Sequence, residues 1–226
     1  MGMPFKQGDV PTGTTLHIER GGSTVASQFD NINRWPDGSI RFATCCIRDS
    51  DFTTGVSRSY DVVRTVGSFD NSTDLTISSI TGAYDLKIEF TSITGSTSGA
   101  MTDRTASFNT AAAVTTRLTQ YEAGPVCESW TAWGMAGTDP HLQVIWYVSA
   151  WKDVGGAIVD VEFCGVPALQ WWSVAAKEKM TYTATLKDGG TTIETYSGVA
   201  HCYMQQWATV RKNNDHQHAT RHWRST

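Results

Sequence analysis

The stretch from Arg34 to Ala43, Arg-Trp-Pro-Asp-Gly-Ser-Ile-Arg-Phe-Ala, limits most tightly what this chain can fold into. Its centre, Pro36-Asp37-Gly38, has strong turn chemistry, because proline presets φ, aspartate bonds back to the backbone and glycine accepts a positive φ. A strand-like run from Ile40 to Ile47 follows at once. The segment therefore predicts the corner of a β-hairpin.

Alternation of apolar and polar residues extends this β pattern along the chain. It is clearest over Tyr84–Phe90, Val159–Phe163 and Met180–Leu186, where every second residue is apolar. This period of two predicts half-buried strands with one solvated face. Lys187-Asp188-Gly189-Gly190 then predicts a turn into a further strand, Thr191–Tyr196, which makes a second hairpin.

The run from Leu142 to Trp151 differs, because both of its faces are apolar. Such a strand is expected at the centre of a sheet or between two layers. No segment shows a convincing helical period. Further strands are expected over Thr14–Glu19, Ser23–Phe29, Ser59–Val66, Asp74–Ile80, Val114–Tyr121, Val126–Gly134 and Ser197–Val210.

About a dozen short strands separated by turn residues predict an all-β, mostly antiparallel β-sandwich of jelly-roll type, with two β lobes as the alternative arrangement. We expect an N-terminal β lobe over residues 1–90 that carries the Trp-Pro-Asp-Gly hairpin. A loop rich in Ser, Thr and Gly is expected over 91–110, and a second lobe or the rest of the sandwich over 111–211. Residues 212–226 are expected to form a polar, basic-aromatic tail that ends as though the chain were cut from something longer.

Composition narrows the function classes. The formal net charge of −4 and the pI of about 5.8 argue against broad binding of nucleic acid or anionic membranes. The five cysteines show no Cys-x-x-Cys pair, which favours buried, reduced thiols over a disulfide framework. The first residues lack the apolar core of a signal peptide, so we expect synthesis in a cytosol.

Two stretches carry a family resemblance. Pro4–Leu16, Gln28-Phe29-Asp30 and Arg34–Phe42 follow one another in an order and spacing that resemble the N-terminal β-domain of proteins grouped with exo-acting rhamnogalacturonan lyases. Large bacteriophage-encoded proteins, some of them virion- or tail-associated, carry a similar stretch. The late segment His218–Arg224 resembles the basic-aromatic stretch that closes this domain.

A lyase needs a cation beside the uronate carboxylate, a base for the C5 proton and an acid for the leaving oxygen. If the chain is a lyase, we expect His201 and Tyr203 as base and acid, because residues two apart share a face of a strand, with Arg211 as the cation. The alternative is an ordinary polar strand face followed by a tail.

Tryptophans supply the candidate glycan-binding residues, since sugar rings stack on exposed indoles. We name Trp171, Trp172 and Trp133, against the alternative that most of the nine tryptophans fill a β core. No native metal and no cofactor are predicted. The weak metal candidates are His216, His218 and His222, which lack a fourth ligand at a diagnostic spacing.

The resemblance and the lack of organised reactive groups favour a non-catalytic structural β-domain of a phage virion, tail-associated, with weak glycan recognition. Its expected partners are other virion subunits or copies of itself, and cell-surface polysaccharide. No nucleic-acid partner and no membrane insertion are expected, and the expected location is the virion after synthesis in the host cytoplasm. The alternatives are an extracellular polysaccharide lyase, or a fragment of one, acting on uronate-containing glycans, and a carbohydrate-binding module.

Overall fold

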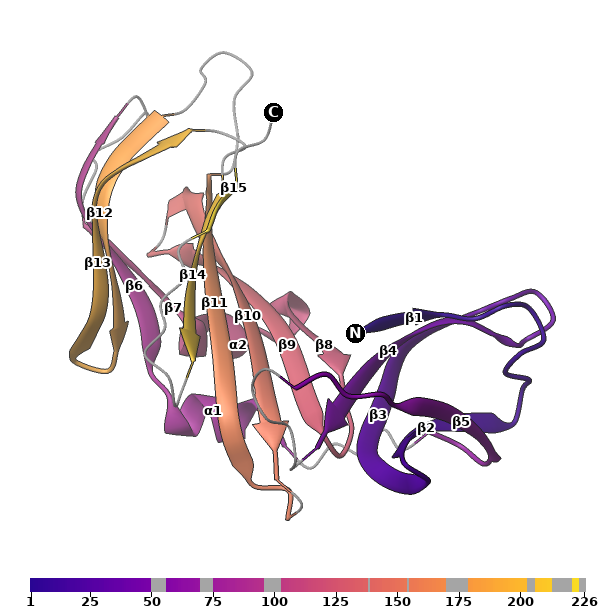
Figure 1. Cartoon of the computed structure of the whole chain (residues 1–226). Coiled ribbons are helices and arrows are strands. Elements are labelled where there is room, and N and C mark those ends of the chain that lie inside the picture. The colour runs from indigo at the N-terminus through magenta and orange to yellow at the C-terminus, as the bar shows by residue number, and fades with distance from the viewer. Residues whose placement is uncertain are drawn as a thin grey trace. The chain divides into compact units, whose positions relative to one another are not determined.

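The computed structural model describes residues 1–49, 56–69, 75–95, 103–137, 139–153, 155–169, 179–202, 206–212 and 221–223. These residues form mostly β-strands, and the strand pairings are antiparallel, which confirms the all-β expectation (Figure 1). None of the described helices has the length and apolar character needed to cross a membrane. The chain divides into two compact units, each described below by itself.

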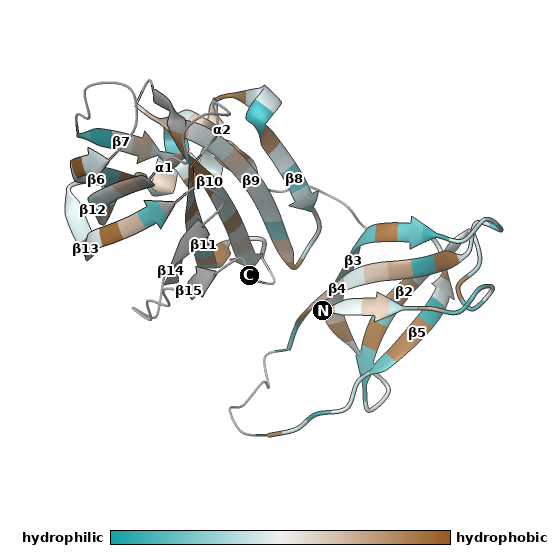
Figure 2. Ribbon diagram, turned by 90° about the horizontal axis from the view of Figure 1, so that it is seen from above, coloured by the Kyte–Doolittle hydropathy of each residue, from teal (hydrophilic) through white to brown (hydrophobic). Residues whose placement is uncertain are grey.

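Unit 1 consists of Met1–Leu75, Gln120–Ser129 and Ala150–Val159. Its N-terminal part is a five-stranded sheet with the order β1-β4-β3-β2-β5. Teal and brown alternate along these strands (Figure 2), which is the period of two that the sequence shows. The strands are β1 (Gly2–Pro4), β2 (Thr14–Arg20), β3 (Ser23–Arg34), β4 (Ile40–Arg48) and β5 (Asp61–Val66).

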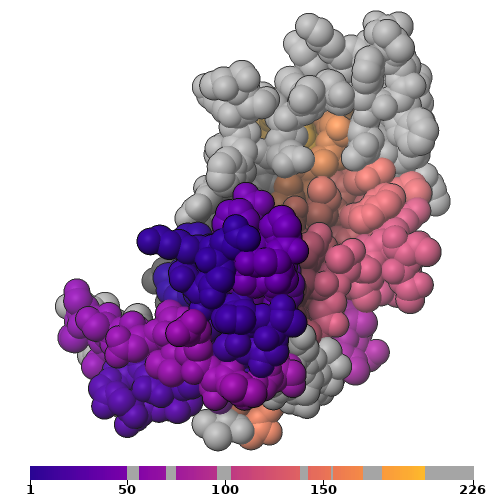
Figure 3. Space-filling view, turned by 90° about the vertical axis from the view of Figure 1, so that its right-hand side faces the viewer, coloured from indigo at the N-terminus to yellow at the C-terminus, as the bar shows by residue number. Residues whose placement is uncertain are grey.

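One apolar cluster forms the core of this sheet. Its members are buried side chains from the strands and from the loop before β2. The atoms that cover the outside of this N-terminal part are drawn in indigo and purple in Figure 3. Burial of these apolar side chains stabilises the sheet, whose other face is exposed to solvent. The buried members are Val10, Leu16, Ile18, Phe29, Ile40, Ala43 and Cys45.

The turn between β3 and β4 has the predicted chemistry. The backbone N–H of Gly38 donates to the Trp35 carbonyl at 2.9 Å, and the Ser39 hydroxyl donates to the Asp37 carboxylate at 2.6 Å. The Ser39 N–H also donates to this carboxylate, at 3.0 Å. The two hydrogen bonds from Ser39 lower the pKa of Asp37 from its ordinary value. The guanidinium of Arg41 lies 4.9 Å from the centre of the Trp35 ring, so the hairpin is confirmed together with its aromatic neighbour.

Gly38→Ala is expected to destabilise unit 1 by about 1–3 kcal/mol. Gly38 has a φ of 86°, and a Cβ there would lie 2.6 Å from Oγ1 of Thr12. Chemical denaturation measures the change, with Gly8→Ala as the control. Gly8 has a φ of 84° and open space around its Cβ position. Equal losses in the two variants would mean that backbone conformation alone, and not the contact with Thr12, sets the cost.

Unit 2 consists of Thr76–Thr119, Trp130–Ser149 and Asp160–Thr226. It contains a four-stranded sheet with the order β13-β12-β6-β7. The strands are β6 (Leu86–Gly95), β7 (Arg104–Ser107), β12 (Lys179–Asp188) and β13 (Thr191–Cys202). The expected hairpin around Gly189-Gly190 is confirmed, because β12 and β13 pair from Asp188–Thr191 upward.

A six-stranded sheet has the order β15-β14-β11-β10-β9-β8, and its strands include residues of both units. In unit 2 it packs on the four-stranded sheet: a Cβ at Gly165 on β11 would lie 3.1 Å from Ile88 on β6. The sandwich-like expectation is therefore confirmed. The strands are β8 (Leu118–Glu122), β9 (Cys127–Ala136), β10 (Asp139–Lys152), β11 (Ile158–Leu169), β14 (Gln206–Lys212) and β15 (Arg221–Trp223).

β10 confirms one of the two positions expected for its apolar run. It is an interior strand, as its apolar run predicts, and Leu142, Val144 and Trp146 on one face are buried. The opposite face is not covered throughout, because Tyr147 is 48% exposed. Apolar residues on both faces therefore place the strand inside a sheet without requiring a layer on each side.

Two segments differ from the predicted elements. The expected strand Asp74–Ile80 is wrong, because Leu75 and Thr76 belong to no strand and Ile77–Ala83 form the helix α1, which buries Ile80. The expected loop over 91–110 contains the end of β6, the edge strand β7 and the helix α2 (Phe108–Ala112). The cause is the same in both, because Ser and Thr suit turns, strands and helix ends about equally and packing decides among them.

Candidate functional site

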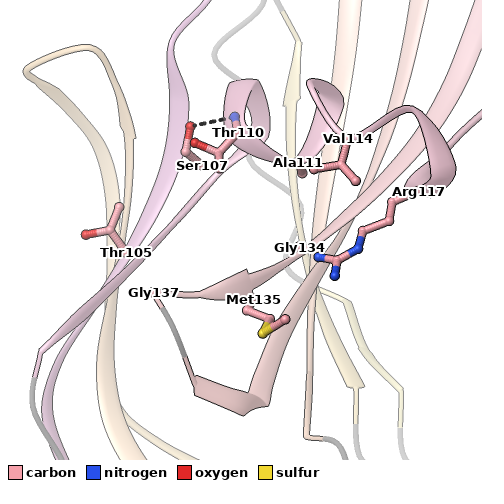
Figure 4. A pocket seen from close by; sticks show the side chains of 9 residues that line it. All are labelled: Thr105, Ser107, Thr110, Ala111, Val114, Arg117, Gly134, Met135 and Gly137. Atoms are coloured by element: carbon pink, nitrogen blue, oxygen red, sulfur yellow. Dashed lines mark hydrogen bonds between the residues drawn. The ribbon is translucent and has the colours of Figure 1, made fainter.

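A pocket of about 540 Å³ in unit 2 is the candidate site (Figure 4). Its walls come from the edge strand β7, helix α2, the short 3-10 helix η1 (Thr115–Arg117) and the end of β9. The lining residues are Thr105, Ser107, Thr110, Ala111, Val114, Arg117, Gly134, Met135 and Gly137.

Local hydrogen bonds and one glycine shape this pocket. The Ser107 hydroxyl accepts a hydrogen bond from the Thr110 N–H at 3.4 Å, which caps α2, as the dashed line in Figure 4 shows. The Gly137 N–H donates to the Thr105 carbonyl at 2.9 Å. A Cβ at Gly134 would lie only 3.2 Å from Cβ of Ala111, so glycine there allows α2 to approach β9 closely.

Arg117 lies on the exposed face of Trp133. Its guanidinium carbon is 4.3 Å from the centre of the indole ring, within the range of a cation–π interaction. η1 fixes the backbone of the arginine, whose N–H donates to the Val114 carbonyl at 2.9 Å. In Figure 4 the side chain extends towards Gly134 and the middle of the pocket. The structure thus places Trp133 beside this pocket as the support of its cation.

The pocket offers a fixed positive charge, three hydroxyl groups and an apolar wall. Arg117 can hold a carboxylate with two parallel hydrogen bonds. The hydroxyls belong to Thr105, Ser107 and Thr110, and Met135 contributes to the apolar side. Among the nine residues drawn in Figure 4, Arg117 is the one ionisable side chain, so these residues can bind an anion and supply no base or acid for proton transfer.

The catalytic candidates lie on other elements. His201 on β13 is 1% exposed, and its Nδ1 is 2.8 Å from the Tyr182 hydroxyl. Arg211 belongs to β14 in the six-stranded sheet, whereas His201 belongs to the four-stranded sheet. Tyr203 lies outside the described residues. Proton transfer by His201 and Tyr203 therefore stays a prediction.

The remaining candidates have little or no description. Trp171, Trp172, His216 and His218 lie outside the described residues. His222 lies on β15, where only the backbone is described. Their assignment to glycan or metal binding stays a prediction.

Sequence reasoning missed Arg117 and the residues around it. Arg117 is one arginine within a Thr-rich stretch, with no spacing that marks a site. Gly134 gave the available signal, because a glycine inside a strand often marks the close approach of another backbone or a ligand.

Comparison with known proteins bears on the N-terminal part alone. Neither the curated proteins nor the solved structures include a match to this chain. Residues 1–64, which contain β1 to β4 and the start of β5, match the family described as the PcRGLX-like N-terminal RIFT barrel domain, and this confirms the resemblance to the N-terminal domain of rhamnogalacturonan-lyase-like proteins.

Proposed function

We propose that this chain is a non-catalytic β-protein that recognises an acidic glycan at the Arg117 pocket. The observation that carries the proposal is the guanidinium held 4.3 Å above the Trp133 ring at the wall of a cavity of about 540 Å³. A stacked arginine loses less freedom when it binds a planar carboxylate, and the neighbouring hydroxyls suit the hydroxyl groups of a sugar.

Arg117→Gln is expected to weaken binding of uronate oligosaccharides by about tenfold or more, because a hydrogen bond to a charged group contributes about 1.5–3 kcal/mol. Trp133→Ala is expected to weaken binding several-fold by removing the surface that orients the guanidinium. Isothermal titration calorimetry measures both effects. The methyl ester of the same oligosaccharide lacks the carboxylate charge and is expected to bind as weakly to the wild type as the acid binds to Arg117→Gln.

Arg41→Gln is the matched control. Arg41 also lies over a tryptophan, at 4.9 Å from the Trp35 ring, but in the β3–β4 hairpin of unit 1. Its loss should leave uronate affinity unchanged. Equal losses in the two arginine variants, or equal affinity of the wild type for acid and ester, would contradict recognition at the Arg117 pocket.

Catalysis by a lyase is the first competing function. It requires a base and an acid beside the bound uronate, and what supports binding over catalysis is that the nine lining residues of the pocket contain neither. We therefore expect no rise in absorbance from new C=C bonds when the chain is incubated with uronate polysaccharides. A rise that Arg117→Gln or His201→Ala abolishes would replace the binding proposal with a lyase.

A structural role in a phage virion is the second candidate, and glycan recognition would then attach the particle to a surface. It extends the resemblance to phage-encoded proteins that the sequence suggests, and it is supported by β5, an edge strand of its sheet on which Val62 is 40% and Val66 92% exposed. Such an edge can accept a strand from a neighbouring subunit.

Native mass spectrometry is expected to show defined oligomers that Val66→Lys disperses, and a chain that stays monomeric at high concentration would contradict assembly.

A further inference from the structure

Two thiols and a carboxylate from three strands converge in unit 1. Sγ of Cys46 on β4, a carboxylate oxygen of Glu122 on β8 and Sγ of Cys127 on β9 all lie within 4.8 Å of one another. Cys46 is 9% exposed and Cys127 is 0% exposed, whereas Glu122 is half-buried. The two sulfur atoms are therefore shielded from solvent, whereas the Glu122 side chain is partly exposed to it.

The surroundings hold Cys127 in place. Oε1 of Gln28 accepts hydrogen bonds from the N–H groups of Val126 and Cys127, both at 3.0 Å. Nε2 of Gln28 donates to the Cys127 carbonyl at 2.9 Å. A Cβ at Gly124 would lie 2.6 Å from Cδ of Gln28, so the glycine leaves room for this arrangement. Such outer contacts are what orient the ligands of a metal site before the metal arrives.

The charges around the thiols favour a cation. The thiol of Cys127 donates to Oε2 of Glu122 at 3.9 Å and accepts from Nε2 of Gln28 at 3.8 Å. A second carboxylate, that of Asp30, is buried and accepts a hydrogen bond from the same Nε2 of Gln28 at 2.6 Å. A divalent cation among these groups would offset both the burial and the mutual repulsion.

We propose that Cys46, Glu122 and Cys127 bind one Zn²⁺ ion per chain. Thiolates select soft or borderline cations over Mg²⁺ and Ca²⁺, and zinc accepts sulfur together with carboxylate oxygen. In a tetrahedral site with Zn–S bonds of about 2.3 Å, the two sulfurs would lie about 3.8 Å apart, so modest side-chain rotation closes the cluster. Both thiols lose their protons on binding, and water takes the fourth position.

The site differs from the glycan pocket in its residues and lies in the other unit, so the two proposals stand or fall separately. It also differs from a disulfide, which would form from the same two thiols by loss of two electrons to an oxidant. Reducing conditions distinguish the two, because they remove a disulfide and leave zinc thiolates in place.

The first experiment titrates the full chain with Cd²⁺, a spectroscopic substitute for Zn²⁺, under a non-thiol reductant. We expect the ultraviolet absorbance of a metal thiolate to saturate at one ion per chain. Cys127→Ala should abolish it, and Glu122→Gln should weaken the affinity by about tenfold or more. Cys45→Ala is the matched control: Cys45 is the neighbour of Cys46 on β4, is 3% exposed and belongs to the apolar core cluster.

The second experiment needs no variant. Zn²⁺ should protect Cys46 and Cys127 from alkylation in the wild type, as located by mass spectrometry, and leave the reactivity of Cys164 unchanged. Cys164 is a lone, half-buried thiol whose pKa burial raises to about 11. The proposal is overturned if the wild type gives no thiolate absorbance, if Cys45→Ala loses the signal as fully as Cys127→Ala, or if a Cys46–Cys127 disulfide forms and no metal binds after its reduction.

Discussion

Lys152→Met is expected to destabilise unit 1 by about 3–5 kcal/mol, because it leaves the Glu128 carboxylate buried without its cation. The ammonium of Lys152 lies 2.9 Å from Oε1 of Glu128, and both side chains are 0% exposed. The carboxylate also accepts hydrogen bonds from the Leu75 N–H and the Gln120 amide, both at 2.9 Å. Chemical denaturation followed by circular dichroism measures the loss.

Two further variants make this result specific. Lys87→Met removes an exposed pair, with 3.4 Å between Lys87 and Asp85, and should cost at most about 1 kcal/mol. Lys152→Met combined with Glu128→Leu should recover part of the stability, because no charge is then left buried alone. A loss for Lys152→Met no greater than that for Lys87→Met would mean that water reaches the buried pair.

Phe108→Ala is expected to cost about 3–5 kcal/mol in unit 2, the usual cost of removing a buried aromatic ring. Phe108 is 0% exposed at the start of α2, and its ring centre lies 5.5 Å from that of Phe163 and 6.1 Å from that of Trp146. The substitution removes the contact that α2 makes with both β10 and β11. Thermal and chemical unfolding of the variant measure the loss.

Tyr147→Ala is the control for this second variant. Tyr147 is also an aromatic residue of unit 2 and the sequence neighbour of Trp146, but it is 48% exposed. Its replacement should change the free energy of unfolding by well under half as much. Comparable losses of stability in both variants would mean that burial of the Phe108 ring does not account for its contribution to the free energy of unfolding.

The sequence predicts the sheets well where a period of two or a turn dipeptide is present. The Pro36-Asp37-Gly38 corner, the β12–β13 hairpin and the interior position of β10 could all be predicted, because each follows from local chemistry. It fails over 91–110, where Ser and Thr suit a loop and an edge strand equally. The helix α1 was missed because its burial rests on one residue, Ile80.

The candidate sites were harder to predict than the fold, because long-range packing assembles them. Cys46 and Cys127 lie 81 positions apart in the sequence and meet in a buried cluster of unit 1 that also contains Val126. Spacing rules for metal sites detect ligands close together in the chain, so the sequence favoured plain buried thiols. Trp133 was identified for its residue type, whereas its partner Arg117 depends on where η1 ends.

Unit 1 is built from three separate stretches of the chain, which limits where the protein can be truncated. The region matched by the N-terminal family ends at residue 64, yet Gln28 bonds to residues 126 and 127, and Arg48 donates to the carbonyl of Lys152 at 2.6 Å. A fragment that ends at residue 75 would leave the side chains of Gln28 and Arg48 without these hydrogen-bond partners. An N-terminal fragment for crystallography or display therefore has to carry residues 120–129 and 150–159, for instance grafted through a short linker.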